Sequence, residues 1–122
     1  MRKGFYHHIH GDQLHDLAIY FLQYEIVKKG GILQEPSIYK KKMYWPCEPD
    51  IIFTIVEKGV RYIHVIEVET DATKASLEKK TNQYVLSTAG VNLTIINLAE
   101  ADADTQTNWI KFSKWLSKHL PI

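Results

Sequence analysis

The sequence predicts an α/β domain in which a mixed central sheet is flanked by helices, and three observations support this prediction. Segments with helical periodicity alternate with β-branched runs in the order α-β-β-β-α-β-α. Two of the β-branched runs are separated by a short turn signal, which predicts an antiparallel hairpin. A helical segment separates the last two strands, so the fourth strand is expected to lie parallel to its neighbour.

The first predicted helix covers residues 11–29, and Gly30 with Gly31 ends its pattern. Its apolar residues recur at helical spacing and are Leu14, Leu17, Ala18, Phe21 and Leu22. The run Ile32–Tyr39 predicts the first strand. Because proline has no N–H to donate, Pro36 favours an edge position for this strand or a break in it.

The second and third strands are predicted at Asp50–Val56 and Val60–Glu69, with Glu57-Lys58-Gly59 as the turn between them. Both runs are rich in β-branched and apolar residues. The first of them is apolar almost throughout, which is typical of a central strand covered on both faces.

A second helix is predicted over Thr73–Ala89 and a fourth strand over Val91–Leu98, followed by the acidic loop Glu100–Asp104. A final amphipathic helix follows, with Trp109, Phe112, Leu116 and Leu120 at helical spacing. We expect Trp109, Phe112 and Trp115 to anchor this helix to the core.

The chain has 122 residues, of which 45% are hydrophobic and 24% charged, and its formal net charge is +1. These values predict a single domain over residues 1–122, with residues 1–10 flexible, and argue against a disordered or repetitive protein. Cys47 has no second cysteine with which to pair, which favours a reducing, cytoplasmic environment. No apolar run approaches the length of a membrane span, so no membrane partner is expected.

Three carboxylates are predicted to meet at one end of the sheet. Asp50 begins one strand of the hairpin, whereas Glu67 and Glu69 end the other. Antiparallel strands place these positions at the same end, and the alternation of side chains puts Glu67 and Glu69 on one face. Carboxylates held close together repel each other unless a cation compensates, and oxygen ligands suit Mg²⁺ or Mn²⁺. The alternative is a solvated strand end with ordinary surface acids.

The dipeptide Pro49-Asp50, an interval of 16 residues and then Glu67-Val68-Glu69 occur inside this element order. The arrangement resembles the PD-(D/E)XK nuclease superfamily, which has the restriction endonuclease-like fold and includes archaeal Holliday-junction resolvases. The resemblance implies that Asp50, Glu67 and the backbone carbonyl of Val68 bind Mg²⁺ or Mn²⁺. Glu69 stands where the superfamily usually has lysine. Some restriction-type members are similar in having glutamate there, and Glu69 would act as a third ligand or orient water.

His15 is a further candidate for the catalytic site. It lies four positions after Gly11, where resolvase-like members often carry an acid. The chain topology agrees, because the start of the first helix and Asp50 are expected at the same end of the domain. Glu25 lies roughly 15 Å further along the helix, so we expect a snorkelling or locally paired acid rather than a catalytic one.

The lysine run Lys40, Lys41 and Lys42 lies among aromatic residues and leads towards Pro49-Asp50. Positive charge beside aromatic rings suits contacts with phosphates and bases, but a solvated loop explains the run equally well. In the predicted second helix, Lys79 and Gln83 are further candidates for contact with a nucleic-acid backbone.

The function predicted from the resemblance is that of a Mg²⁺- or Mn²⁺-dependent nuclease which hydrolyses phosphodiester bonds in DNA, with RNA left open as a substrate. A domain of this size has no separate sequence-reading module, so DNA structures or ends are the expected targets. A homodimer is also implied, because resolvase-like members cut paired strands as dimers. The alternative is a non-catalytic nucleic-acid-binding or assembly protein on the same fold.

Overall fold

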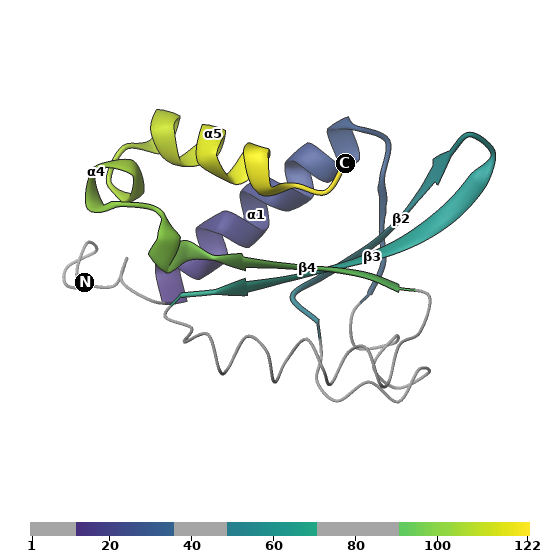
Figure 1. The fold of residues 1–122 in the computed structure, drawn as a ribbon, viewed down its shortest axis with the longest axis horizontal. Coiled ribbons are helices and arrows are strands. Elements are labelled where there is room, and N and C mark those ends of the chain that lie inside the picture. The colour runs from purple at the N-terminus through teal and green to yellow at the C-terminus, as the bar shows by residue number, and fades with distance from the viewer. Residues whose placement is uncertain (1–11, 36–48, 71–90) are drawn as a thin grey trace.

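The computed structural model describes residues 12–35, 49–70 and 91–122 (Figure 1). Within these ranges, four strands form one sheet in the order β1-β2-β3-β4. The strands are β1 (Ile32–Leu33), β2 (Ile51–Glu57), β3 (Val60–Glu69) and β4 (Val91–Asn97). The fold is therefore α/β with a mixed sheet, as the sequence predicts.

The strand pairing agrees with the predicted antiparallel meander and parallel fourth strand. β1 pairs with β2 and β2 with β3 in antiparallel fashion, while β3 and β4 run parallel. The chain between β3 and β4 includes the predicted helix Thr73–Ala89, which lies outside the described residues. The first strand is described only as Ile32–Leu33, and the part of its predicted range from Pro36 onward also lies outside them.

The hairpin turn sets the register of β2 against β3. Lys58 and Gly59 both have positive φ angles, of 51° and 80°, as a two-residue type I′ turn requires. Glycine adopts such an angle without a steric penalty, which explains its place here. Pairing then runs from Glu57 with Val60 at the turn to Ile51 with Ile66 at the far end.

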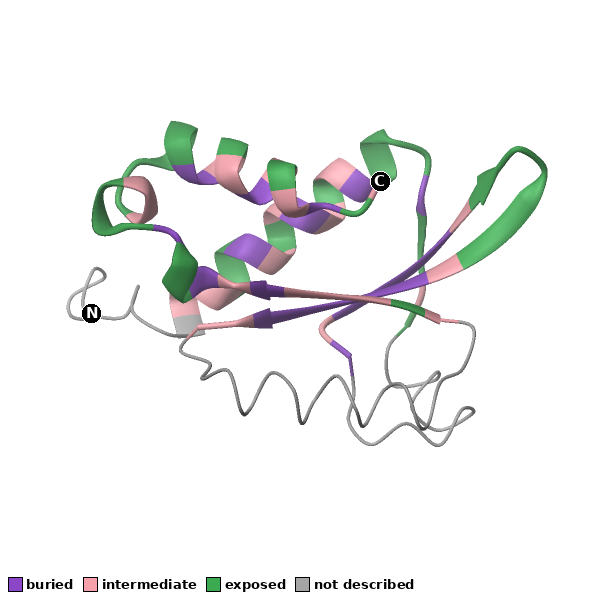
Figure 2. Cartoon of the chain, viewed as in Figure 1, coloured by how far each residue is buried: buried purple, intermediate pink, exposed green. Residues whose placement is uncertain are grey.

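Two helices, α1 (Asp12–Lys28) and α5 (Trp109–His119), cover one face of the sheet (Figure 1). Figure 2 shows that the buried positions of both helices and of the strands face each other across this layer. The main core consists of buried side chains from α1, β2, β3, β4 and α5: Leu14, Ala18, Leu22, Ile26, Ile51, Phe53, Ile66, Val68, Ile96, Leu98, Phe112, Leu116 and Leu120. Burial of this apolar surface is the main favourable term for the fold.

The opposite face of the sheet has a smaller cluster, in which Ile52 and Val65 are buried. Residues 51–54 are therefore buried on both faces of β2, which confirms that this strand is central. The end of the hairpin next to the turn is exposed to solvent, as Val56, Val60 and Tyr62 show.

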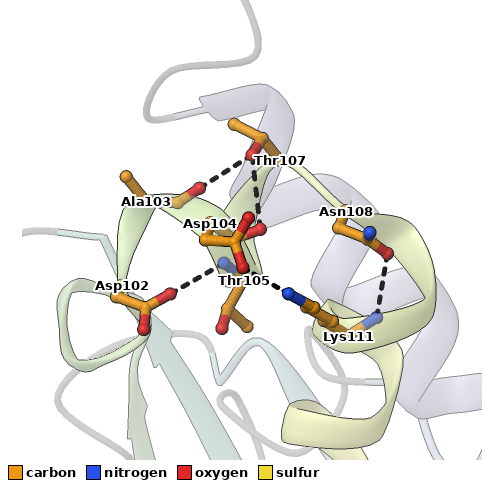
Figure 3. Close-up of polar contacts among 7 residues, drawn as sticks. All are labelled: Asp102, Ala103, Asp104, Thr105, Thr107, Asn108 and Lys111. Atoms are coloured by element: carbon orange, nitrogen blue, oxygen red, sulfur yellow. Dashed lines mark hydrogen bonds and ion pairs between the residues drawn. The ribbon is translucent and has the colours of Figure 1, made fainter.

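The acidic segment after β4 is not the simple loop that the sequence predicts. It contains a short 3₁₀ helix η2 (Leu98–Glu100) and the one-turn helix α4 (Ala103–Gln106). Asp102 caps α4 by accepting a hydrogen bond of 2.8 Å from the backbone N–H of Thr105, and this bond lowers the pKa of Asp102 (Figure 3). Asp104 then pairs with Lys111 on α5. Asp102 and Asp104 therefore stabilise the local structure around α4 and the start of α5.

α5 begins at an N-cap, because Asn108 Oδ1 accepts a hydrogen bond of 3.2 Å from the backbone N–H of Lys111 (Figure 3). Phe112 is buried as predicted and Trp115 packs against the core. The prediction that Trp109 is a core anchor is wrong, since its side chain is 49% exposed. As the first residue of α5, Trp109 lies beside the exposed surface of α1 instead.

The helices of the described ranges are too short or too polar to cross a membrane.

Candidate active site

Asp50 lies at the junction of three elements. It follows the buried Pro49 and directly precedes β2, at the end of the sheet where β3 finishes. The last backbone pair between β2 and β3 is Ile51 with Ile66. Beyond it, the side-chain carboxylate of Asp50, rather than the backbone of β2, bonds to β3. Its Oδ2 accepts a hydrogen bond of 2.8 Å from the backbone N–H of Val68. The side chain is thereby held against the residue that separates Glu67 from Glu69.

α1 contributes His15 to the same place. The ring atom Nε2 of His15 lies 3.3 Å from Oδ2 of Asp50, although 35 residues separate the two in sequence. His15 is the fourth residue of α1, so the start of this helix lies at the same end of the domain as Asp50. The expected proximity of the two residues is observed.

His15 stands between two carboxylates, because its Nδ1 also lies 3.3 Å from Oδ1 of Asp16. Neutral imidazole has a single N–H, so only the doubly protonated ring donates to both acids. Partial burial lowers the pKa of His15, but the hydrogen bond with Asp16 and the charge of Asp50 outweigh burial and raise the pKa above its ordinary value. The arrangement therefore favours a positive charge next to Asp50.

Glu67 and Glu69 lie at the C-terminal end of β3. Ile66 and Val68 face the core formed with α1 and α5, so the intervening Glu67 lies on the opposite face of the sheet, together with Glu69. Glu67 is only 2% exposed, whereas Glu69 is half-buried at the strand end. The predicted placement of all three acids at one end of the sheet, with the two glutamates on one face, agrees with this register.

The described side chains do not by themselves assemble a metal site. Within residues 12–35, 49–70 and 91–122, no three His, Cys, Asp or Glu side chains are grouped closely enough to hold a metal ion. Asp50 directs Oδ2 towards His15 and the N–H of Val68. Position 50 lies directly beyond the Ile51–Ile66 pair, so the register places it opposite Glu67 at the end of the sheet. Carboxylate oxygens are the ligands that Mg²⁺ prefers, and metal binding by these acids stays a prediction.

The predicted contacts with nucleic acid lie outside the described residues. They are Lys40, Lys41, Lys42, Lys79 and Gln83.

Glu25 is locally paired, which is one of the two non-catalytic roles expected from its distance along α1. Its Oε2 lies 3.3 Å from Nζ of Lys28, and its Oε1 accepts a hydrogen bond of 3.2 Å from the hydroxyl of Ser117 on α5. Glu25 thus joins the two helices and takes no part in the candidate site.

His64 is a buried titratable residue that the sequence reasoning missed. It is 7% exposed and stacks on Phe53, with ring centroids 4.9 Å apart and planes 7° from parallel. Neither ring nitrogen has a hydrogen-bond partner among the described residues. Burial lowers the pKa of His64, and the charge of Glu57 offsets part of this effect. The predicted hairpin turn pairs position 64 with Phe53 in the apolar part of the sheet. This pairing is the sequence signal that indicates burial of His64.

No family model, curated protein or solved structure matches the chain. Any function proposed for this chain therefore rests on its own residues and their geometry.

Proposed function

We propose that this protein is a metal-dependent nuclease that hydrolyses phosphodiester bonds in DNA, on a restriction endonuclease-like fold. One observation carries the proposal. The carboxylate of Asp50 is fixed to the backbone of Val68 between Glu67 and Glu69, and His15 is within 3.3 Å of it. Two strands and a helix thus bring acidic and basic groups to one end of a sheet.

The order of the strands supports the proposed fold. An antiparallel meander of three strands is followed by a fourth strand parallel to the third, and helices α1 and α5 cover one face. The acids lie at the end of the central strands rather than in the hairpin turn. This combination is what the resemblance to the PD-(D/E)XK superfamily implies.

Asp50, Glu67 and the carbonyl of Val68 would hold Mg²⁺ or Mn²⁺. The two contacts of Asp50 with described residues both use Oδ2, so Oδ1 remains available as a ligand. In a strand, the N–H and C=O of one residue point to the same edge, so the carbonyl of Val68 lies on the edge that carries Asp50. The bound ion would supply an activated water and neutralise charge on the phosphate oxygens.

His15 would act on the phosphate as a positively charged group. Its two carboxylate partners favour the protonated ring, which can stabilise negative charge that develops on the scissile phosphate or donate a proton to the leaving oxygen. Its contact with Asp50 also fixes the orientation of that carboxylate. His15 therefore has both a positioning and a proton-transfer role in the proposal.

Glu69 differs chemically from the lysine that the superfamily usually has at this position, since a carboxylate cannot supply positive charge near the attacking water. We assign Glu69 to a third ligand position or to the orientation of that water. The substrate class that we propose is DNA with accessible ends or branches, in keeping with the resemblance to resolvase-like members of the superfamily.

The test is cleavage of labelled linear, single-stranded, nicked and four-way-junction DNA with Mg²⁺ or Mn²⁺. Asp50→Asn and Glu67→Gln should each abolish cleavage, because a neutral amide is a poor ligand for a hard cation. Glu57→Gln is the matched control, since Glu57 is an exposed acid at the opposite end of the same hairpin. A wild-type protein that cuts none of these substrates with either metal contradicts the proposal.

A non-catalytic nucleic-acid-binding or assembly protein is the second candidate. It is favoured by Glu69 at the lysine position and by the lack of a group of three metal-ligating side chains among the described residues. Calorimetry with Mn²⁺ separates the two candidates. Saturable binding that Asp50→Asn removes favours the nuclease, whereas DNA binding without metal binding favours the alternative.

A further inference from the structure

The outer face of α1 carries exposed residues arranged symmetrically about Leu22, which is itself buried on the inner face. Tyr20 and Tyr24 form the central pair and are 77% and 60% exposed. The other pairs are Leu17 with Val27 and Asp16 with Lys28, all of them exposed. The stripe therefore has an aromatic centre, flanking aliphatic residues, an acid at one end and a base at the other.

A groove adjoins this stripe where α1 meets the beginning of α5. It has a volume of about 400 Å³ and is lined by Leu17, Tyr20, Phe21, Tyr24 and Trp109. Phe21 and Trp109 form its floor through an edge-to-face contact with ring centroids 5.5 Å apart. Exposed aromatic residues around an apolar groove are typical of the centre of protein interfaces.

We propose that two copies of this chain associate through α1, with the two helices antiparallel about a two-fold axis near Leu22. This arrangement places Asp16 of each copy opposite Lys28 of the other, so the dimer gains two ion pairs. It also places Tyr20 opposite Tyr24 of the second copy, above the groove. A two-fold interface uses the same surface on both subunits, which the symmetry of the stripe satisfies.

Charge complementarity specifies the orientation. In a parallel arrangement, Asp16 would face Asp16 and Lys28 would face Lys28, and both contacts would be repulsive. The antiparallel arrangement replaces them with attractive pairs. It also selects a second copy as the occupant, because the stripe is complementary to itself.

The contacts of the charged residues within one chain are compatible with this pairing. Lys28 lies 3.3 Å from Glu25 and 5.4 Å from the ring centroid of Tyr24, and Asp16 lies 3.3 Å from His15. The ammonium of Lys28 has three donors, and the carboxylate of Asp16 has a second oxygen. Each group can therefore make a further contact across the interface.

Sedimentation equilibrium between about 1 and 200 µM protein at low salt tests the proposal, because the range covers weak and moderate dimers. Asp16→Lys and Lys28→Glu should each raise the dimer dissociation constant by about tenfold or more, since each creates two like-charge contacts. The double variant exchanges the charges and should return to within about threefold of wild type. Lys29→Glu, which lies outside the stripe and changes the net charge as Lys28→Glu does, is the control for that variant.

A second set of variants tests the aromatic centre. Tyr20→Arg and Tyr24→Arg should abolish the dimer, whereas Tyr62→Arg, at an exposed tyrosine of the hairpin, should leave it intact. Circular dichroism confirms that each variant is folded. A monomeric wild-type protein throughout the concentration range overturns the proposal, and so does a dimer that survives both tyrosine variants. These outcomes do not depend on nuclease activity.

Discussion

Replacing His64 by leucine should stabilise the protein, and more so at acidic pH. His64 is buried in the sheet, and neither of its ring nitrogens has a hydrogen-bond partner in the described part of the chain. Leaving a buried polar group without a partner costs about 1–3 kcal/mol, while the stacking of His64 on Phe53 returns about 0.5–1.5 kcal/mol. The difference leaves about 1 kcal/mol in favour of leucine at pH 8, where histidine is neutral in both states.

The pH dependence follows from the lowered pKa of His64. Below about pH 6.5, the unfolded chain binds a proton that the folded chain resists, so the wild type loses stability as the pH falls through this value. The loss is at most about 1.4 kcal/mol per pH unit for one group. The free energy of unfolding of His64→Leu should therefore exceed that of wild type by an additional amount of up to about 1.4 kcal/mol at pH 5.5.

Urea denaturation followed by circular dichroism at pH 8, 7, 6 and 5.5 measures this difference. Val65→Ala is the control, because it creates a cavity on the same strand without removing a titratable group. It should lower the free energy of unfolding by about 2 kcal/mol at every pH. If the difference in unfolding free energy between His64→Leu and wild type stays constant or shrinks as the pH falls, then His64 does not destabilise the folded state at acidic pH.

Three further predictions concern the site and the helices. Asp50→Asn should lower the pKa of His15, because a charge and an ionic hydrogen bond are lost, and NMR titration of the imidazole measures this shift. Asn108→Ala should destabilise the protein by about 1 kcal/mol through loss of the α5 cap, whereas Asn108→Ser should retain most of the stability in urea denaturation. Gly31→Ala should cost about 1–3 kcal/mol, because the new Cβ would lie 2.5 Å from Ile26 Cγ2; an unchanged melting temperature would contradict this.

Local signals in the sequence are enough to predict much of the fold. β-branched runs on either side of Lys58-Gly59 predict the hairpin, and the turn fixes its register. That register places Asp50 at the same end of the sheet as Glu67 and Glu69. The parallel direction of β4 follows from the long connection before it, since a hairpin turn can join only antiparallel strands.

Which side chains meet depends on the packing of helices and strands that are distant in the sequence. The contact between His15 and Asp50 joins positions 35 residues apart, and its geometry depends on how α1 packs on the sheet. Packing also leaves Trp109 at the surface, although its spacing along α5 matches that of the core residues. Periodicity defines a face of a helix, but the width of the buried part of that face depends on the neighbouring element. Side-chain partners are likewise set by long-range packing, which no local pattern in the sequence encodes.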